Sequence, residues 1–405
     1  MPDNRHFLTS LLTNGASEII QKISRIAVVI VVARVMEAEA IGLAAAAIAA
    51  GDILKSLTET GVVQRIIAAP DKALPAVVTT ARRLFRLWCI GLFAVQCLFA
   101  AGIWMWSGGT LIPLMIALLA LEYLVMPAGI VHCALAMRAG KLTGTAGVAG
   151  GQVVLANILT AGLAMVFPSP LALILPRVLT APVWLIGMRR LHPDVPAPVT
   201  DAAPVSHFVG FGACLLGSEV IKTLRLQGDK LVIGATLGAE ALGIYFFAFN
   251  AGLSLATSIS KAFSRVVFPT IAAATNRARA TGEAVWLGLL FTTPIVILQA
   301  LATPYYVPFL LGEDWAYISP IVSILCLAAI PTMVWSGTAQ WLRAEDRALT
   351  ELAVTTGLTV SLLTATYFLS PLGLEAIAWG YLAISCLVQL VASVPLFLSI
   401  RRMEA

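Results

Sequence analysis

The sequence predicts an all-α, polytopic membrane protein with about twelve transmembrane helices, arranged as two parallel six-helix lobes around a central cavity. Three observations predict this fold class: the composition, the number and length of the apolar segments, and a repeat between the two halves. Of 405 residues, 59% are hydrophobic and 12% are charged, whereas a soluble domain has about 25% charged residues. The apolar segments are continuous, which argues against the alternating strands of a transmembrane β-barrel.

The apolar segments have the length that a helix needs to cross a bilayer, about 20 residues. Six lie in the first half, near residues 12–34, 41–66, 84–106, 110–133, 143–167 and 170–188. Six more lie in the second half, near residues 207–238, 241–264, 284–311, 317–342, 351–370 and 373–399. A proline-rich segment of low hydrophobicity separates the two series and is typical of an extended linker. We therefore expect an N-terminal lobe of residues 1–192, a cytoplasmic linker of residues 193–206 and a C-terminal lobe of residues 207–405.

Lysine and arginine are concentrated in every second loop, as the positive-inside rule describes for cytoplasmic loops. The alternate loops contain neither residue; they are 107–110, 167–170, 238–242, 311–317 and 370–374. Arg34, at the outer end of the first segment, departs from the pattern. The segment 207–238 is the most polar, but it must cross, because otherwise the basic residues of every later loop would lie outside. The distribution predicts that both termini are cytoplasmic.

The two halves resemble each other at four places in the same order. Residues 17–25 match 218–225 with one deletion, and Ala38-Glu39-Ala40-Ile41-Gly42-Leu43 matches Ala239-Glu240-Ala241-Leu242-Gly243-Ile244. Ala50-Gly51 matches Ala251-Gly252, and Met137-Arg138-Ala139 matches Leu342-Arg343-Ala344. Because six crossings return the chain to its starting side, both halves enter the membrane in the same direction. The repeat is therefore parallel, about an axis along the membrane normal.

Several classes of protein and site are not expected. The four histidines are scattered without metal-ligand spacing, and the six cysteines lie in or beside apolar segments as reduced thiols. The basic residues lie between apolar segments and orient the chain, so no nucleic-acid partner is expected. No Walker lysine loop is present, so no ATPase is built into this chain. We expect a transport protein without a cofactor and not an enzyme. The start of the chain lacks the signals of a cleaved secretory peptide, so the first helix should be retained.

Ionisable residues inside the predicted helices are the candidate functional residues, because each costs about 2.5–3.5 kcal/mol at a helix centre. They are concentrated in the first, second and seventh segments, where they follow one helical face at spacings of three and four. Such a face is expected to line a central cavity. The candidate substrate-binding cations are Lys22, Arg25, Lys222, Arg225, Lys230 and Arg177. The candidate ion-coupling carboxylates are Glu18, Asp52, Glu59, Glu219 and Asp229.

The alternative is that these charges pair with one another and fix the helices together. The possible pairs at helical spacing are Glu18–Lys22, Arg225–Asp229, Asp52–Lys55 and Glu219–Lys222. The excess of cations favours an anionic ligand, since an arginine fork binds phosphate oxygens bidentately. Arg177, after Pro176, can equally pair structurally, and the isolated Glu122 can equally form a structural hydrogen bond.

Short motifs in a fixed order resemble the bacterial polysaccharide flippases, the Wzx-type O-antigen and exopolysaccharide transporters, which share a superfamily with the multidrug and toxin extruders. In the first half they are Ala33-Arg34-Val35, Ala40-Ile41-Gly42-Leu43 and Thr60-Gly61-Val62-Val63-Gln64. In the second half they are Gly228-Asp229-Lys230-Leu231-Val232-Ile233-Gly234, Leu242-Gly243-Ile244-Tyr245 and Phe268-Pro269. The resemblance covers nearly the whole chain, which is short, with twelve expected helices where many relatives have fourteen.

The resemblance implies a flippase that carries undecaprenyl-diphosphate-linked oligosaccharide repeat units across the bacterial inner membrane, for lipopolysaccharide or exopolysaccharide biosynthesis. It implies alternating access, in which two lobes rock about the linker while cavity cations hold the diphosphate. A proton or sodium gradient would drive the cycle. The implied partners are the lipid-linked oligosaccharide, membrane lipid, a polysaccharide polymerase and a chain-length regulator.

Two other functions remain open at this point. One is a cation-coupled drug or metabolite exporter of the same fold, which would need an acidic or aromatic cavity for cationic drugs. The other is a membrane scaffold of a glycan-synthesis complex that transports nothing and would tolerate neutralised cavity charges. The excess of cations argues against the drug exporter, and the effect of charge substitutions on glycan export separates the scaffold from the flippase.

Overall fold

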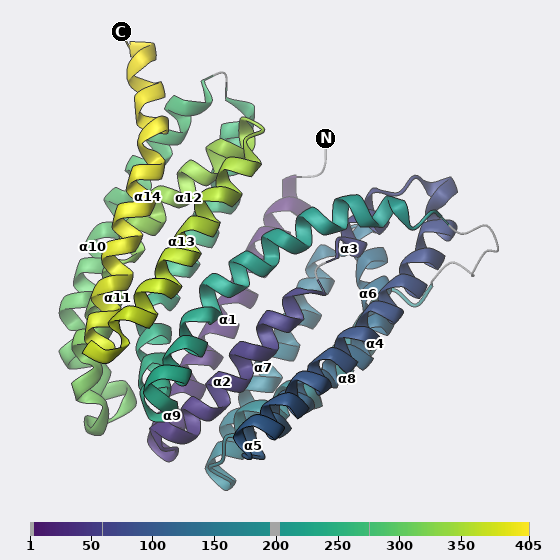
Figure 1. The fold of residues 1–405 in the computed structure, drawn as a ribbon. Helices are drawn as coiled ribbons and strands as arrows, with labels where there is room; N and C mark the ends of the chain where they lie inside the picture. Colours follow the sequence, from purple (N-terminus) through teal and green to yellow (C-terminus); the bar gives the residue numbers. More distant parts are fainter. Residues whose placement is uncertain (1–3, 59, 195–202, 275, 405) are drawn as a thin grey trace. The chain divides into compact units, whose positions relative to one another are not determined.

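The computed structural model describes residues 4–58, 60–194, 203–274 and 276–404, in which every regular element is a helix (Figure 1). Side chains are described within these ranges except at 4–19, 206–207, 209–211, 213–215, 254–262, 264–270, 272–273 and 401–404. The predicted all-α class is confirmed. The chain forms two compact units, Met1–Thr223 and Leu224–Ala405.

The first unit contains eight α-helices and the start of a ninth. They are α1 (Asn4–Val35), α2 (Ala38–Ser56), α3 (Val62–Ala68), α4 (Leu74–Ser107), α5 (Leu111–Ala120), α6 (Glu122–Arg138), α7 (Leu142–Val166) and α8 (Leu171–Leu191). α1 packs against α7, and α6 packs against both α4 and α8. The core between α3, α4 and α6 buries Ile66, Phe85 and Tyr123. α6 therefore lies inside this unit, which matters for the charge it carries.

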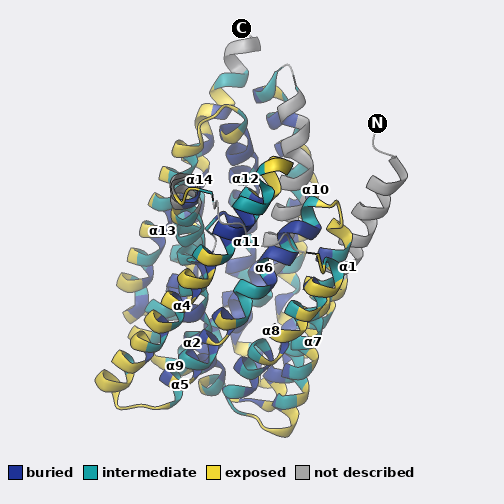
Figure 2. Cartoon of the chain, turned by 90° about the vertical axis from the view of Figure 1, so that its right-hand side faces the viewer, coloured by how far each residue is buried: buried dark blue, intermediate teal, exposed yellow. Residues whose placement is uncertain are grey.

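The second unit begins within α9 (Ser206–Ala273), which is interrupted at Gly238. The remaining elements are α10 (Arg277–Leu311), the 3₁₀-helix η2 (Glu313–Ile318), α11 (Ser319–Leu327), α12 (Ala329–Ala344), α13 (Ala348–Leu369), η3 (Ser370–Leu372) and α14 (Leu374–Glu404). α10 packs against α11 and α12, and α13 packs against α14. Figure 2 shows α11 largely as buried residues, and its neighbours in this unit enclose it.

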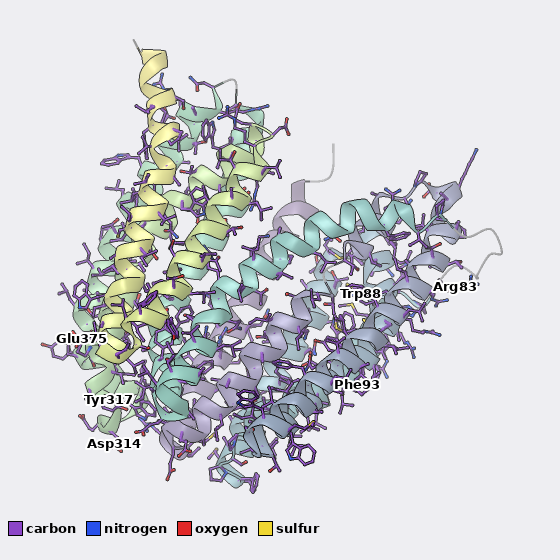
Figure 3. The ribbon with its side chains drawn as sticks, viewed as in Figure 1. Arg83, Trp88, Phe93, Asp314, Tyr317 and Glu375 are labelled. Carbon is purple, nitrogen blue, oxygen red and sulfur yellow. The ribbon has the colours of Figure 1, made fainter. Side chains whose placement is uncertain are left out.

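The loops predicted without basic residues coincide with interruptions of the helices. The chain turns between α4 and α5, between α7 and α8, at Gly238, after Leu311 and at η3. Four of these five turns contain a glycine with positive φ: Gly108, Gly238, Gly312 and Gly373. Residues with a Cβ adopt this conformation at a cost, so glycine ends the helix there. In the second unit, the labelled residues Asp314, Tyr317 and Glu375 lie at one end, which places two of these turns together (Figure 3).

Two predicted cytoplasmic loops are in fact helical. α4 begins at Leu74 and α10 begins at Arg277, earlier than the predicted segments that start near residues 84 and 284. These helices have 34 and 35 residues, or about 51 Å at 1.5 Å per residue, against a hydrocarbon core of about 30 Å. Hydropathy locates the lipid-facing part of a helix, whereas its backbone hydrogen bonds continue into the polar region. The first turns of α4 therefore carry Arg82, Arg83 and Arg86 as helical residues.

The second predicted segment, 41–66, is not one helix. α2 ends at Ser56 and α3 begins at Val62, after Gly61 with a φ of 73°. Arg138, at the end of α6, donates to the carbonyl oxygens of Ile66 and Ala69 and pairs with Asp71 at 2.5 Å. The Arg138 guanidinium group donates to backbone carbonyl groups at the end of α3 that have no partner within the helix. It therefore holds the short helix against α6, a structural role for a cation that the sequence assigned only to topology.

Nine helices in the described part of the chain are long and apolar enough to cross a membrane. The difference from the predicted twelve has a simple cause. α1 and α2 carry the candidate functional charges and fall outside the nine, and the two predicted segments within α9 count as one. Two more predicted segments are divided: 110–133 is α5 and α6, with a break at Leu121, and 317–342 is mainly α11 and α12, with a break at Ala328.

The start of α9 packs with the first unit. The Thr80 hydroxyl donates to the carbonyl of Ala203 at 2.7 Å, and Phe208 is buried in the same core as Phe85. The boundary between the compact units falls between Thr223 and Leu224, inside α9. The predicted lobes and the linker at 193–206 stay a prediction, and residues 195–202 of that linker lie outside the described residues.

Cutting the chain within residues 195–202 and co-expressing the two pieces is expected to retain activity. The second piece keeps Ala203 and Phe208, so its first turns can still pack on the first unit. A second piece that begins after Gly212 lacks these contacts and is expected to lose most activity at equal protein level. Complementation of a deletion strain measures both. Equal activity of the two cuts would show that the packing of residues 203–212 is dispensable.

Candidate substrate and ion site

Four charged side chains from three helices form a network inside the first unit, here called the unit-1 charge cluster: Asp52, Lys55, Glu122 and Arg177. Arg177 Nη2 donates to Asp52 Oδ1 at 2.8 Å, and its Nε lies 3.4 Å from Glu122 Oε1. Lys55 Nζ donates to the other oxygen of Glu122. Arg177 therefore bridges the two carboxylates, and Glu122 contacts both cations.

The local structure explains how these residues meet. Asp52 and Lys55 are three residues apart on α2, so they share one face of that helix. Glu122 is the first residue of α6, directly after the turn at Leu121 that separates α5 from α6. Arg177 follows Pro176 in α8, and α8 packs against α2, α5 and α6. α8 therefore brings Arg177 to the carboxylates of two other helices.

The four side chains are buried to different extents. The side chain of Glu122 is 8% exposed, whereas Lys55 and Arg177 are 38% and 28% exposed. The cluster contains two positive and two negative groups, so its formal charge is zero. Charges that are removed from water persist when they are paired and hydrogen-bonded. The pairing accounts for the stability of a carboxylate at the centre of an apolar helix pair.

α1 adds two further cations of the predicted set. Lys22 and Arg25 are exposed, and Arg25 lies close enough to Asp52 for their charges to interact. Asn157 of α7 donates to the Ser24 hydroxyl at 2.8 Å, which fixes the rotation of α1 at this level. Glu18 and Glu59 have side chains outside the described set. Their predicted roles stay predictions.

The second unit holds a separate buried pair, Asp229 and Lys230 of α9, whose side chains are 2% and 5% exposed. Their charged groups are 3.6 Å apart. The Tyr245 hydroxyl donates to Asp229 at 2.8 Å, and Lys230 lies 4.1 Å above the centre of the Phe249 ring, a cation–π contact. Lys230 also donates to the carbonyl of Leu226. These contacts favour the structural alternative for Asp229 and Lys230.

The other two cations of the seventh segment are less enclosed. Lys222 pairs with Glu219 at 2.6 Å, the i,i+3 pair that the sequence predicted. Arg225 is half-buried and lies near Tyr381 of α14. The pair predicted between Arg225 and Asp229 does not form among the described contacts, because Asp229 bonds to Lys230 and Tyr245. Arg225 therefore lies outside the contacts that hold Asp229, and its role in ligand binding stays a prediction.

The structure brings together part of the predicted site. Arg25, Asp52 and Arg177 meet in the first unit, while Arg225, Asp229 and Lys230 lie in the second. The central cavity between two lobes stays a prediction. The sequence set omitted Lys55 and Glu122, which complete the cluster. The available signal for Glu122 was a single carboxylate between two long apolar stretches, and for Lys55 its spacing from Asp52.

Comparison with known proteins identifies a family model and relatives that match this chain. A family model described as "Polysaccharide biosynthesis protein" matches residues 31–320. The teichuronic acid biosynthesis protein TuaB of Bacillus subtilis is 27% identical over 173 residues, which are 41% of this chain and 34% of TuaB. The lipopolysaccharide biosynthesis protein WzxC of Escherichia coli is 26% identical over 169 residues, 40% of this chain and 33% of WzxC. The matches thus span about a third of the length of these curated relatives.

Solved structures show the same fold. The lipid II flippase MurJ in an inward closed conformation matches 96% of this chain and 87% of its own, with a TM-score of 0.78 and 13% identity. An inward-facing multidrug transporter of the MATE family matches 95% of both chains, with a TM-score of 0.69 and 15% identity. The fold is therefore the one that these transporters share, in a chain with several helices long and apolar enough to cross a membrane. With the family model covering most of its length, the chain belongs to the polysaccharide biosynthesis protein family.

Proposed function

We propose that this protein is a flippase for lipid-linked oligosaccharides. It moves polyprenyl-diphosphate-linked repeat units from the inner to the outer leaflet for surface polysaccharide biosynthesis. The observation that carries the proposal is the joint match to the family and to the fold of a lipid II flippase. Two of the curated relatives are named for teichuronic acid and lipopolysaccharide biosynthesis, both surface polysaccharides.

The charges inside the helices support an anionic lipid-linked substrate. A sugar diphosphate has polar groups that hydrocarbon does not solvate, so a carrier must supply polar contacts across the membrane. Arg25, Arg177 and Arg225 have guanidinium groups within the described helices and are all partly exposed. Guanidinium matches the spacing of phosphate oxygens and remains charged at any physiological pH. The polyprenyl tail would stay in lipid while these groups hold the diphosphate.

The cycle that fits this fold is alternating access. The two predicted lobes would expose the site first to one side and then to the other. The energy would come from a proton or sodium gradient, for which the partly exposed Asp52 and Glu219 are better candidate carboxylates than the buried Asp229. A polysaccharide polymerase and a chain-length regulator are the partners we propose downstream. Both termini are proposed to be cytoplasmic.

Cysteine labelling tests this orientation. In a variant without native cysteines, a membrane-impermeant thiol reagent added from outside should label a cysteine at Gly109 or Asp314, which lie in turns without basic residues. Gly109 is preferred to Gly108 and Gly312, which have positive φ. Ala139 and Ala280 should be labelled only after the membrane is permeabilised. Outside labelling at Ala280 would contradict the crossing of the segment at 207–238.

A deletion strain tests the function itself. The strain should lose a surface polysaccharide and accumulate its lipid-linked precursor on the cytoplasmic side, because synthesis continues while translocation stops. A drug exporter predicts altered drug resistance with normal polysaccharide. A scaffold predicts that variants with neutralised Arg25 or Arg225 still export glycan at normal protein level. Either of these results would contradict the flippase.

A further inference from the structure

The first part of α4 carries three arginines directly before an exposed apolar stripe. Arg82 is half-buried, and Arg83 and Arg86 are exposed. Leu87 and Ile90, which follow them, are 70% and 50% exposed. The spacing of residues 83, 87 and 90 places one arginine and both apolar side chains on the same face of the helix. The three arginines are here called the α4 arginine cluster.

We propose that the α4 arginine cluster binds the phosphate groups of anionic phospholipids of the bilayer, of which phosphatidylglycerol is the representative. The cluster lies apart from the unit-1 charge cluster, whose members belong to α2, α6 and α8. Binding requires that α4 crosses a membrane, as its length and hydropathy allow, and it does not depend on what the protein transports.

The apolar part of α4 has the length that places its arginines at the level of the lipid headgroups. Between Arg86 and the end of the helix, α4 contains no lysine, arginine or acidic residue. Arg86 and Trp106 are about 20 residues apart, or about 30 Å at 1.5 Å per residue, the thickness of the hydrocarbon core. Trp104 and Trp106, at the far end, are 53% and 93% exposed, as aromatic residues of a membrane interface are. The arginines therefore begin where the hydrocarbon ends on the other side.

Trp88 marks the same level of the helix. Its indole Nε1 donates to the carbonyl oxygen of Leu57 at 2.7 Å, and the residue is 40% exposed. An indole that is exposed and hydrogen-bonded at its polar edge is typical of the membrane interface. Leu57 caps the end of α2, so this bond fixes α4 to α2 close to the arginines. Arg83 and Trp88 follow each other along α4 in Figure 3.

Other cations of unit 1 have partners within the protein. Arg138 pairs with Asp71 at 2.5 Å, and Lys141 donates to the carbonyl oxygen of Leu191 at 2.8 Å. The two arginines at 189–190 lie in the last turn of α8, where the helix dipole favours a positive charge. α4 contains no acidic residue, and within the described part of the chain its arginine cluster forms no ion pair.

α10 provides a contrast within the same chain. It corresponds to the third predicted segment of the second half, as α4 does in the first, and it has 35 residues against 34. Near its start, Arg279 pairs with Glu283 at 2.9 Å, and Arg277 lies 3.6 Å from Glu345. The protein itself thus neutralises the cations at the start of α10, whereas those of α4 are available to an external anion.

The position of the cluster favours a phospholipid over an acidic soluble partner. Guanidinium groups donate paired hydrogen bonds to phosphate oxygens, and Arg83 and Arg86, three residues apart, are neighbours on the helix surface. The acyl chains of a lipid held there would lie along Leu87 and Ile90. A soluble protein would leave this apolar stripe uncovered. Basic residues beside a membrane attract anionic lipids in this way.

The test counts the phospholipids that bind to the purified full-length protein. The protein in neutral detergent micelles is titrated with phosphatidylglycerol or with phosphatidylcholine of the same acyl chains, and native mass spectrometry measures the fraction with bound lipid. The wild-type protein is expected to bind phosphatidylglycerol more tightly by about tenfold or more, because the choline group of phosphatidylcholine neutralises its phosphate.

Three variants assign the preference to the cluster. Arg83→Gln with Arg86→Gln is expected to weaken phosphatidylglycerol binding by about tenfold and to leave phosphatidylcholine binding unchanged. Both side chains are exposed, so the variant should fold. Arg83→Lys with Arg86→Lys should keep most of the preference, since the charge remains. The matched control is Arg189→Gln with Arg190→Gln, which removes two exposed arginines from α8 and should change the affinity by less than about threefold.

Three results would overturn the site. The first is equal affinity of the wild-type protein for the two lipids. The second is an equal loss of preference in the α8 control, since the general positive charge of the protein would then explain the binding. The third is displacement of phosphatidylglycerol by an equal concentration of a polyprenyl diphosphate, which would assign the arginines to the transported lipid. The deletion strain tests the proposed function separately, because lipid binding is measured without transport.

Discussion

Replacing Arg177 by alanine is expected to lower the free energy of unfolding by up to about 3–5 kcal/mol, the cost of leaving a buried charge without its partner, here Glu122. Arg177 contacts both carboxylates of the unit-1 charge cluster, so its loss leaves Asp52 and Glu122 with less compensation. The measurement is unfolding of the purified protein in mixed micelles with increasing denaturant. Arg190→Ala is the matched control, an exposed arginine at the end of the same helix.

Combined substitution shows whether the loss comes from unpaired carboxylates. Arg177→Ala with Asp52→Asn and Glu122→Gln is expected to recover most of the stability, because no unpaired carboxylate remains. If Arg177→Ala is as stable as Arg190→Ala, the ion pairs contribute nothing measurable, and the cluster does not hold α2, α6 and α8 together.

Replacing Arg225 by alanine is expected to reduce glycan export by about 10- to 100-fold while the protein stays folded in the membrane. Loss of a hydrogen bond to a charged group costs about 1.5–3 kcal/mol. The variant should still fold, because Asp229, the predicted partner of Arg225, contacts Lys230 and Tyr245 instead. Arg225→Lys should restore only part of the export, since the ammonium keeps the charge and loses the fork. Export of surface polysaccharide and protein level are measured in the same complemented strain.

Lys230→Met is the contrasting variant, because it leaves Asp229 buried with one partner fewer, and it is expected to lower the protein level.

The double variant Arg225→Ala with Asp229→Asn tests whether Arg225 serves only to neutralise Asp229. Restored export in this double variant would show that Arg225 serves only to neutralise a carboxylate. Continued loss of export at unchanged protein level would favour contact between Arg225 and the ligand.

The sequence was sufficient for the helical class and for the loops without basic residues. The predicted loops 107–110, 238–242, 311–317 and 370–374 contain the helix breaks at Gly108, Gly238, Gly312 and Gly373, because apolar length is a local property. The start of α4 could not, because the hydropathy of a segment changes at the membrane surface while its helix continues past it. The turn between α2 and α3 was missed for another reason. It lies at Gly61, inside the single segment predicted at 41–66, and Arg138 contacts only the far end of α3.

The sequence predicted that the site consists of charged residues within helices, but it identified only some of those residues. A charge within an apolar helix is visible in the sequence, so Asp52, Arg177 and Asp229 were identified as candidates. Their partners were not, because pairs between helices depend on rotation and packing. Spacing along one helix suggested Arg225 for Asp229, whereas the structure pairs it with the adjacent Lys230 and with Tyr245. Glu122 was identified as isolated, and three-dimensional packing places it between Lys55 and Arg177.

Translocation by the purified protein tests the central claim most directly. The protein is reconstituted into liposomes that contain a polyprenyl-diphosphate-linked oligosaccharide in both leaflets, and a glycosidase added outside cleaves the exposed sugars. Without protein, about half of the lipid should be cleaved, since two leaflets share it. With the wild-type protein, cleavage should approach completion, and with Arg225→Ala it should remain near half. Cleavage that stops near half with the folded wild-type protein, in the presence of either a proton or a sodium gradient, would contradict the account.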